Sequence, residues 1–367
     1  MNNKNKTFYI FLSFILIIIF YAIYGLYGVY DINKNNALLF NEKKDYIFHK
    51  KYSKKLHHLR DSSRWGEVQN DYLFSIINNI SNTKKTIMFQ GDSWVESIAE
   101  IESSKRLLKN FAKKNNFKII NAGITSYAPS VMNAQYKILK KDFNFVPDIL
   151  VIYIDQTDLG DEFCRYRHNK VYSSEKEFLY VKNEQYNKAI YDYTKIYEYS
   201  ELKFQNLGFK ILKYPFIKIR FFLKRNLNQV KQIISEGYSN KDFKKCSFEY
   251  IQKELISPSK DSIENFNISL NEYFNNLKKE TEIKKIFIVT FPHLNHHKMI
   301  YKVNVSNLID EFLRDFDDKR IQHLDMSKIE DVKENYYTIY KKDLASHLKD
   351  KFNTSIFLKS IVNQLSN

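Results

Sequence analysis

The sequence contains few of the residues that define several specialised classes of protein. Its 367 residues include 8 glycines, 5 prolines and 2 cysteines. So little glycine and proline excludes a collagen-like chain, and two cysteines cannot build a disulfide scaffold. Cys164 and Cys246 stand in no metal-ligand spacing, and no internal repeat is visible. The two cysteines fit either one disulfide or two separate thiols.

Acidic residues are scarce relative to basic ones. The chain has 58 Lys and Arg against 42 Asp and Glu, a net charge of +16. A charge of this size suggests nucleic-acid binding, but the lysines are scattered among Asn, Ile, Tyr and Phe and form no basic motif. We therefore expect no nucleic-acid partner, and a lysine-rich surface that suits anionic glycans or lipid head groups. With 44% hydrophobic residues, the chain is long and apolar enough to fold as a globular protein.

Charge is absent from one long stretch near the N-terminus. Residues 8–30, FYIFLSFILIIIFYAIYGLYGVY, carry none, and about 20 apolar residues are enough to cross the hydrocarbon core of a membrane. Lys4 and Lys6 precede the stretch, and no convincing small-residue cleavage site ends it. We predict an uncleaved transmembrane signal anchor.

The flanks of this stretch bear on topology. Residues 1–7 form a short basic tail, which is typical of a signal anchor with a cytoplasmic N-terminus, although the lysines after the stretch do not favour that orientation. We predict a single-pass protein of the inner (cytoplasmic) membrane whose body lies in the periplasm. Residues 31–80 are polar and lysine-rich and predict a juxtamembrane stalk.

From residue 81 to 367 short apolar runs alternate with amphipathic segments. The apolar runs predict strands at 86–89, 117–120, 148–154, 286–291 and, more weakly, 321–324. Helical spacing predicts helices at 97–115, 130–141 and 263–277. This alternation indicates an α/β fold, a three-layer α/β/α domain with a parallel sheet covered on both faces. The Tyr- and Lys-rich stretch 165–258 interrupts it and predicts an insertion or cap.

Polar groups follow the predicted strands at the ends where open parallel sheets bind ligands. They are Gly91-Asp92-Ser93, Asn121-Ala122-Gly123, Asp155-Gln156-Thr157-Asp158 and, near the C-terminus, Asp343 with His347. Each group alone fits a turn, a helix cap or an exposed ion pair. In this order, they supply a nucleophile, an oxyanion hole and a base with its orienting acid. Those are the groups that acyl transfer requires.

These blocks resemble those of the SGNH hydrolases, also called the GDSL family, over about 85–165 and 260–350. GDSWVE and NAGITSYAPS carry most of the resemblance, which is nearest to the membrane-anchored exported branch that handles O-acyl groups of cell-surface polysaccharides. The resemblance implies that Ser93 is the nucleophile, His347 the general base and Asp343 the acid that orients it. It also implies that the N–H groups of Ser93 and Gly123 bind the oxyanion. We expect no cofactor, because the chain itself supplies every group that this mechanism needs.

The chain departs from the family pattern at two points. Where the family has Gly-x-Asn-Asp, this chain has Asp155-Gln156-Thr157-Asp158, so the amide donor is missing unless the Thr157 hydroxyl replaces it. Loss of one such donor typically costs ~10²–10³ in rate. Asp343 precedes His347 by four positions instead of three. A Ser–His dyad without the acid therefore stays open.

Further residues beside these blocks are assigned to substrate binding: Asp92, Trp94, Tyr127, Asp158 and His293. The two aromatic rings would stack on a sugar, although such rings more often pack in the core. His293 begins a segment with two further histidines, but no carboxylate or cysteine lies at ligand spacing beside them. We therefore predict no metal site.

Two functions stay open at this point. The first is a serine-dependent esterase or O-acyltransferase that acts on acyl groups, acetyl foremost, of a cell-surface glycan or on a small ester, with polysaccharide-biosynthesis proteins as partners. The second is a non-catalytic glycan-binding or polysaccharide-assembly protein with a decayed site, which Asp155 and Thr157 favour. The joint presence of Ser93, Gly123 and His347 favours the enzyme.

Overall fold

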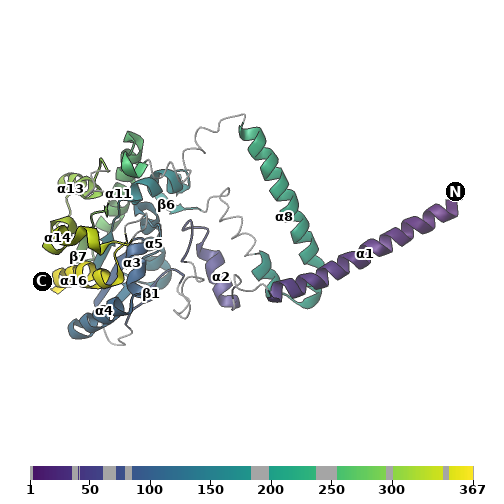
Figure 1. Ribbon diagram of the computed structural model, residues 1–367, viewed down its shortest axis with the longest axis horizontal. Coiled ribbons are helices and arrows are strands. Elements are labelled where there is room, and N and C mark those ends of the chain that lie inside the picture. Colours follow the sequence, from purple (N-terminus) through teal and green to yellow (C-terminus); the bar gives the residue numbers. More distant parts are fainter. Residues whose placement is uncertain are drawn as a thin grey trace. The chain divides into compact units, whose positions relative to one another are not determined.

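The computed structural model describes residues 3–34, 40, 42–60, 72–78, 85–182, 198–236, 254–294, 301–341 and 347–366. The chain divides into two compact units (Figure 1). The smaller unit contains Met1–Lys51 and Glu184–Asp242, and the larger contains Tyr52–Asn183 and Phe243–Asn367.

A six-stranded sheet forms the centre of the larger unit. Its strands are, in spatial order, β1 (Ser75–Ile76), β3 (Phe117–Asn121), β2 (Lys85–Gln90), β4 (Ile149–Tyr153), β7 (Lys285–Thr290) and β8 (Ile321–Asp325). All neighbouring strands are parallel except β1, which runs antiparallel to β3. The chain moves from β2 out to β3 and then crosses back to β4 on the other side of β2. Ligands of open α/β sheets bind at such a reversal, beyond the carboxyl ends of the strands.

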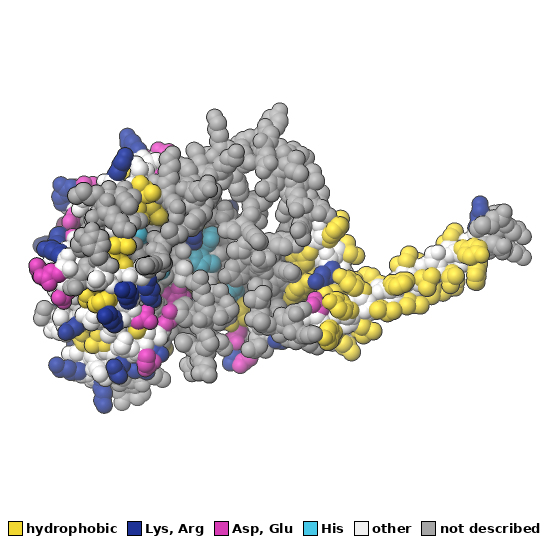
Figure 2. All heavy atoms as spheres, viewed as in Figure 1, with side chains coloured by type: hydrophobic (Ala, Val, Ile, Leu, Met, Phe, Trp, Pro, Cys, Tyr) yellow, Lys and Arg dark blue, Asp and Glu magenta, His cyan; other side chains and the backbone are white. Residues whose placement is uncertain are grey.

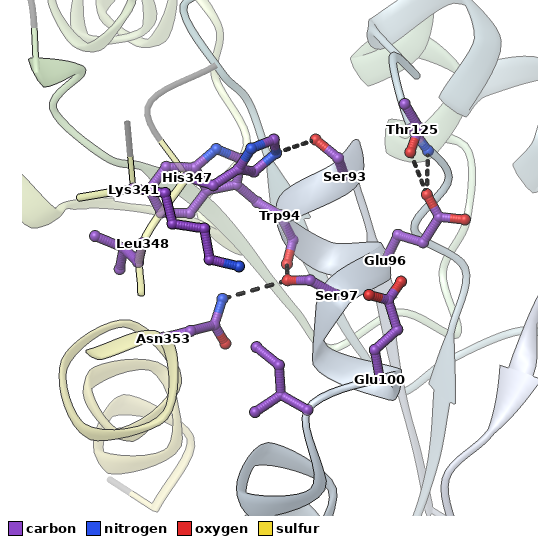
Figure 3. A pocket seen from close by; sticks show the side chains of 11 residues that line it. Ser93, Trp94, Glu96, Ser97, Glu100, Thr125, Lys341, His347, Leu348 and Asn353 are labelled. Carbon is purple, nitrogen blue, oxygen red and sulfur yellow. Dashed lines mark hydrogen bonds between the residues drawn. The ribbon is translucent and has the colours of Figure 1, made fainter. Parts of the chain in front are cut away.

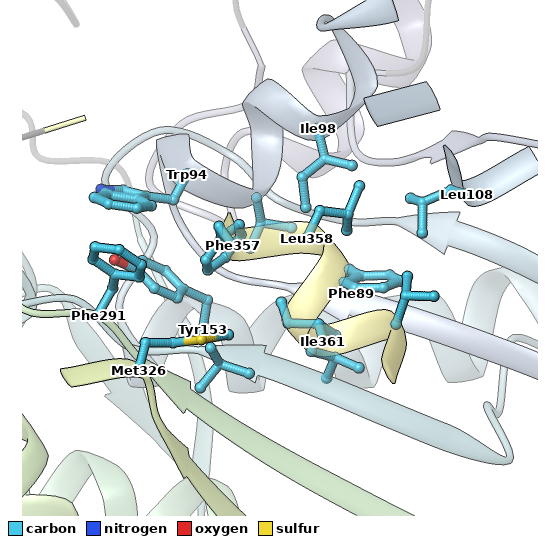
Figure 4. Packing of buried hydrophobic residues seen from close by; sticks show 14 of the residues in the cluster. Phe89, Trp94, Ile98, Leu108, Tyr153, Phe291, Met326, Phe357, Leu358 and Ile361 are labelled. Carbon is cyan, nitrogen blue, oxygen red and sulfur yellow. The ribbon is translucent and has the colours of Figure 1, made fainter. Parts of the chain in front are cut away.

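Helices cover both faces of this sheet. One layer contains α4 (Glu102–Asn115), α14 (Glu330–Ile339) and α16 (Lys359–Ser366), and the other contains α5 (Pro129–Phe143), α11 (Lys260–Lys278) and α13 (Val305–Asp315). On the first face, Phe89 and Tyr153 of the strands pack with Leu108, Phe357 and Ile361 (Figure 4). Alternate strand residues face opposite sides, so the neighbouring strand residues pack against the second layer.

A polar contact marks that second face. The Gln90 side chain donates to Gln135 of α5 at 2.8 Å and accepts from the Tyr273 hydroxyl of α11 at 2.5 Å. The predicted α/β/α architecture is thus confirmed.

Shorter elements complete the larger unit: α3 (Ser93–Glu96), η3 (Ser97–Ala99), α6 (Asp158–Gly160), η4 (Asp161–Tyr166), β5 (Lys170–Tyr172), β6 (Phe178–Val181), η5 (Met326–Lys328), α15 (Asp350–Phe352) and η6 (Asn353–Leu358). The antiparallel pair β5–β6 lies inside the stretch 165–258 that predicts an insertion. Cys164 is buried. Its potential disulfide partner Cys246 lies outside the described residues.

Part of the predicted stalk at 31–80 belongs to the larger unit. β1 extends the sheet by pairing Ser75 with Asn121, and the Tyr52 hydroxyl donates to Asp142 of α5 at 2.9 Å. The contacts within the chain place the boundary of the unit at Tyr52, well before residue 81.

The smaller unit consists of helices: α1 (Asn3–Lys34), most of α2 (Lys43–Tyr52) and α8 (Leu207–Glu236). Within α1, Lys6–Ile32 is long and apolar enough to cross a membrane, with a mean hydropathy of 2.4, and a signal sequence would share these properties. Figure 2 shows apolar side chains along the surface of this helix. α1 packs against α8.

Candidate active site

Ser93 begins the helix that follows β2 at the reversal of the sheet. The Asp92 carboxylate accepts the N–H of Trp94 at 2.9 Å and caps α3, as an N-terminal Asp commonly does. A Cβ on Gly91 would lie 2.7 Å from a methyl group of Val95. Because glycine avoids this overlap, the chain can turn closely under α3 and present the Ser93 side chain at the sheet edge.

His347 reaches Ser93 from the other end of the chain. A short antiparallel bridge between Tyr340 and Leu348 holds the segment, and the Lys341 N–H donates to the His347 carbonyl at 2.6 Å. The bridge brings His347 Nε2 to 2.6 Å from Ser93 Oγ (Figure 3). The two residues are separated by 254 positions, so the fold creates this pair.

The pair opens into a small pocket of about 170 Å³. Its walls come from α3 and η3 on one side and from the C-terminal segments on the other (Figure 3). The lining residues are Ser93, Trp94, Glu96, Ser97, Glu100, Ile101, Thr125, Lys341, His347, Leu348 and Asn353. The Lys341 ammonium forms an ion pair with Asp350 at 2.8 Å. With Glu96 and Glu100 on the other wall, charged side chains of both signs line the pocket beside the Ser–His pair.

The two other residues assigned to the oxyanion hole use their donors within the protein. The Gly123 N–H donates to the Asn121 side-chain carbonyl at 2.8 Å. The Thr157 hydroxyl donates to the Asp155 carboxylate at 2.7 Å. Ser93 is the first residue of α3, where a backbone N–H has no intrahelical acceptor.

A cluster of buried carboxyl groups lies behind Ser93, at the ends of β2 and β4. Burial raises the pKa of Asp92 and of Asp158 well above the usual range. The negative charge of Asp155 adds to this effect at both residues, and that of Asp92 adds to it at Asp158. Burial also raises the pKa of Asp161 to about 6, although Arg165, 2.9 Å away, opposes the shift. Asp158 accepts the N–H of Asp155 at 3.2 Å. Asp92 and Asp158, expected to bind substrate, are thus buried and hold backbone groups.

The aromatic residues assigned to substrate binding are packed inside the protein. Trp94 is 1% exposed and stacks on Tyr153 at 5.3 Å between ring centroids. Tyr127 is 0% exposed and donates its hydroxyl to the carbonyl of His58 at 2.8 Å. His293 is also buried, against the ring of Tyr301 at 5.0 Å. At 1% and 0% exposure, neither the Trp94 ring nor the Tyr127 ring offers a free face on which a sugar could stack.

A buried ion pair that no sequence motif predicts lies beneath the pocket. Arg60 Nε lies 3.2 Å from a Glu96 oxygen, and the two side chains are 9% and 4% exposed. The other Glu96 oxygen accepts the N–H of Thr125 at 2.7 Å, and also its hydroxyl. Arg60 further donates to the Gly123 carbonyl at 2.7 Å. These contacts connect the helix of Ser93 to the loop of Gly123. In the sequence, the acidic Glu96 within GDSWVE was the one feature that could have indicated this ion pair.

A buried histidine lies beside that loop. His58 Nε2 is 2.7 Å from the Thr125 carbonyl, and burial lowers the pKa of His58 to about 4. Its ring is therefore neutral at physiological pH and acts as a donor to the loop.

Asp343, expected to orient His347, lies outside the described residues, as do the two histidines that follow His293 at 296 and 297. Within the described ranges, no three His, Cys, Asp or Glu side chains are grouped so that they could hold a metal ion.

Comparison with known proteins gives only distant similarity. No protein-family model matches the chain, and no curated protein matches it. Among solved structures, an acetylxylan esterase from Geobacillus stearothermophilus is 9% identical with a TM-score of 0.38, over 78% of this chain and 96% of that one. An acetyl xylan esterase from the rumen bacterium Butyrivibrio proteoclasticus is 8% identical with a TM-score of 0.35, over 79% of this chain and 65% of that one. The functional assignment therefore depends on the geometry of the site.

Proposed function

We propose that the chain is a serine-dependent esterase or O-acyltransferase of the SGNH type, with Ser93 as nucleophile and His347 as general base. One observation carries the proposal: Ser93 Oγ and His347 Nε2 lie 2.6 Å apart at the mouth of a pocket. A hydroxyl in this contact can lose its proton to the imidazole as it attacks a carbonyl carbon.

The reaction follows from this contact. Ser93 Oγ bonds to the acyl carbon while His347 Nε2 takes the hydroxyl proton, and the tetrahedral oxyanion lies near the N–H of Ser93. The imidazolium then protonates the leaving alcohol as the ester bond breaks, which leaves an acyl group on Ser93. Water, or a sugar hydroxyl, loses a proton to His347 and attacks the acyl carbon, and Ser93 is released with its proton restored.

The volume of the pocket supports a short acyl group. A space of about 170 Å³ is small for a ligand site, so we assign an acetyl group rather than a long acyl chain. The polar side chains among the lining residues, such as Ser97, Thr125 and Asn353, suit a hydroxyl-rich alcohol such as a glycan. In this proposal α1 anchors the protein in the cytoplasmic membrane and the larger unit works in the periplasm on a cell-surface polysaccharide.

The test compares two serines of the same pocket in the full-length protein in detergent. Ser93→Ala should lower p-nitrophenyl acetate hydrolysis by at least about 10³-fold, because the nucleophile is lost. It should also abolish labelling by a fluorophosphonate. Ser97→Ala is the matched control, since Ser97 lines the pocket but donates to the Trp94 carbonyl at 2.8 Å. A folded Ser93→Ala protein that keeps full turnover would refute the proposal.

One observation favours the competing function, a glycan-binding or assembly protein with a decayed site. The Gly123 N–H and the Thr157 hydroxyl are both engaged within the protein. Binding of an acetylated oligosaccharide, together with neither turnover nor fluorophosphonate labelling of Ser93, would support that function instead.

A further inference from the structure

α8 carries an exposed apolar stripe along its first turns. The stripe consists of Leu212, Phe216, Ile219 and Leu223, which are 65%, 59%, 52% and 52% exposed. Their spacing of four, three and four residues places them on one face of the helix. A contiguous apolar face of this length is unfavourable in water and marks a surface that contacts another apolar phase.

This stripe is not the face by which α8 packs in its own unit. Tyr214, Ile217 and Phe221 form that face, and they are buried with Ile32 of α1 and with Leu202. The helix therefore has one apolar face that the protein covers and a second that the described part of its unit leaves exposed.

The position of α8 along α1 indicates what the second face meets. Gly25 and Gly28 allow close packing, because a Cβ on either would overlap Ile211 or Tyr214 of α8. The Tyr214 hydroxyl donates to Asp31 at 2.6 Å. These contacts lie at the C-terminal end of the apolar stretch Lys6–Ile32. If α1 crosses the bilayer, that end lies at the membrane–water boundary.

The charges of this part of α8 are all positive. Residues 207–223 contain Lys210, Lys213, Lys218 and Arg220 and no acidic residue. Lys218 and Arg220 are paired within the unit, with Asp31 at 3.6 Å and with Glu198 at 3.3 Å, which leaves Lys210 and Lys213 for a surface contact. Lys213 Nζ lies 4.9 Å from the centre of the Phe209 ring, so its stem follows an apolar surface while its charge stays at the helix boundary. An apolar stripe with basic residues beside it is the pattern of helices that lie in the surface of anionic membranes.

We propose that residues 207–223 of α8 lie in the head-group region of the bilayer, on the side where α1 ends, with the stripe in the acyl chains and with Lys210 and Lys213 on anionic phospholipid head groups. This rests on the proposed membrane anchoring by α1 and is independent of esterase turnover. It gives the protein a second membrane contact beside the anchor.

The experiment places single tryptophans in the full-length protein reconstituted into vesicles that contain brominated lipid. Phe216→Trp tests the stripe, Ile17→Trp reports the anchor, and Ile268→Trp is the control, an exposed apolar position on α11 of the larger unit. We expect brominated lipid to quench more than about half of the added fluorescence at 17 and 216, because both would lie within the bilayer, and little of it at 268. Quenching at 216 should be stronger with phosphatidylglycerol than with phosphatidylcholine alone, and Lys210→Gln with Lys213→Gln should reduce that difference.

The other outcomes overturn the proposal in distinguishable ways. Quenching at 17 without quenching at 216 would keep the anchor and reject the membrane contact of α8. A blue-shifted emission at 216 without quenching would show that protein, such as a second copy of the chain, covers the stripe. No quenching at either position would reject the anchor and this contact together, and equal quenching in both lipid mixtures would reject the anionic preference.

Discussion

Arg60 connects three segments around the candidate site. Replacing it tests how much its buried contacts contribute to the stability of the protein. Its guanidinium contacts Glu96, donates to the Gly123 carbonyl at 2.7 Å and reaches the Ser75 hydroxyl at 3.5 Å. Arg60→Met keeps an unbranched side chain of similar length while it removes the charge and every donor. The Glu96 carboxylate would then stay in the interior without its counter-charge.

The structure sets the size of the effect. Both members of the pair are more than nine-tenths buried, so water does not screen them. Removing one partner of such a pair typically lowers the free energy of unfolding by about 3–5 kcal/mol, because the remaining charge stays desolvated. Among the described residues, Glu96 would then keep the two donors of Thr125, which do not neutralise it. A loss of this size is a large part of the ~5–15 kcal/mol that stabilises a typical domain.

Guanidinium chloride unfolding of the full-length protein in detergent, followed by tryptophan fluorescence, measures this loss as a shift in the midpoint. The double variant Arg60→Met with Glu96→Gln should recover part of it, because a neutral Gln still accepts from Thr125. Lys105→Met is the control. Its partner Glu102 has a side chain that is 76% exposed, and exposed pairs contribute little, so the midpoint should barely move.

Two results would refute this reasoning. Arg60→Met could leave the free energy of unfolding within about 1 kcal/mol of the parent value, as an exposed ion pair would. Alternatively, the double variant could be no more stable than Arg60→Met alone, which would show that the charge left on Glu96 is not the cause of the loss.

Three further predictions follow from contacts around Ser93. Gly123→Ala should destabilise the protein by at least about 1–3 kcal/mol, as overpacking does, because its Cβ would overlap the backbone nitrogen of Glu96; an unchanged melting midpoint would contradict this. Since the pKa of Asp161 is raised to about 6, its contribution to stability is present in acid and is lost as the pH rises through 6. Asp161→Asn should therefore remove about 2 kcal/mol of the fall in unfolding free energy between pH 4 and pH 7, and an undiminished fall would refute it. Thr157→Val should change kcat by less than about tenfold, because the hydroxyl is engaged by Asp155; a loss of ~10²–10³ would instead identify it as an oxyanion donor.

The strands of the sheet were predictable from the sequence because parallel strands buried on both faces are continuous apolar runs. The run at 117–120, for example, corresponds to β3 (Phe117–Asn121). The predicted helix 97–115 is instead divided, since Ile101 has an extended backbone and α4 begins at Glu102. The sequence has no glycine or proline at this position that would have predicted the break.

The parts that residues before 81 play in the sheet and in the candidate site could not be predicted from the sequence. β1 has only two residues, Ser75 and Ile76, too few for any period to appear. Arg60 stands in a polar, basic stretch and differs there in no local way from the lysines around it. Its importance comes from Glu96 and Gly123, which are 36 and 63 positions away along the sequence. Only the folded sheet brings these residues together.

The hydrogen bonds that the expected oxyanion donors form within the protein could not be predicted from the sequence either. They affect which donor can stabilise the oxyanion. If Ser93 attacks an ester, the oxyanion must compete for the Gly123 N–H with the Asn121 carbonyl and for the Thr157 hydroxyl with Asp155. A carboxylate at 155 holds a donor more strongly than a neutral carbonyl does. Gly123 is therefore the donor that a developing oxyanion would recruit more readily. The Arg60 contact to the Gly123 carbonyl then fixes the loop in which this exchange would take place.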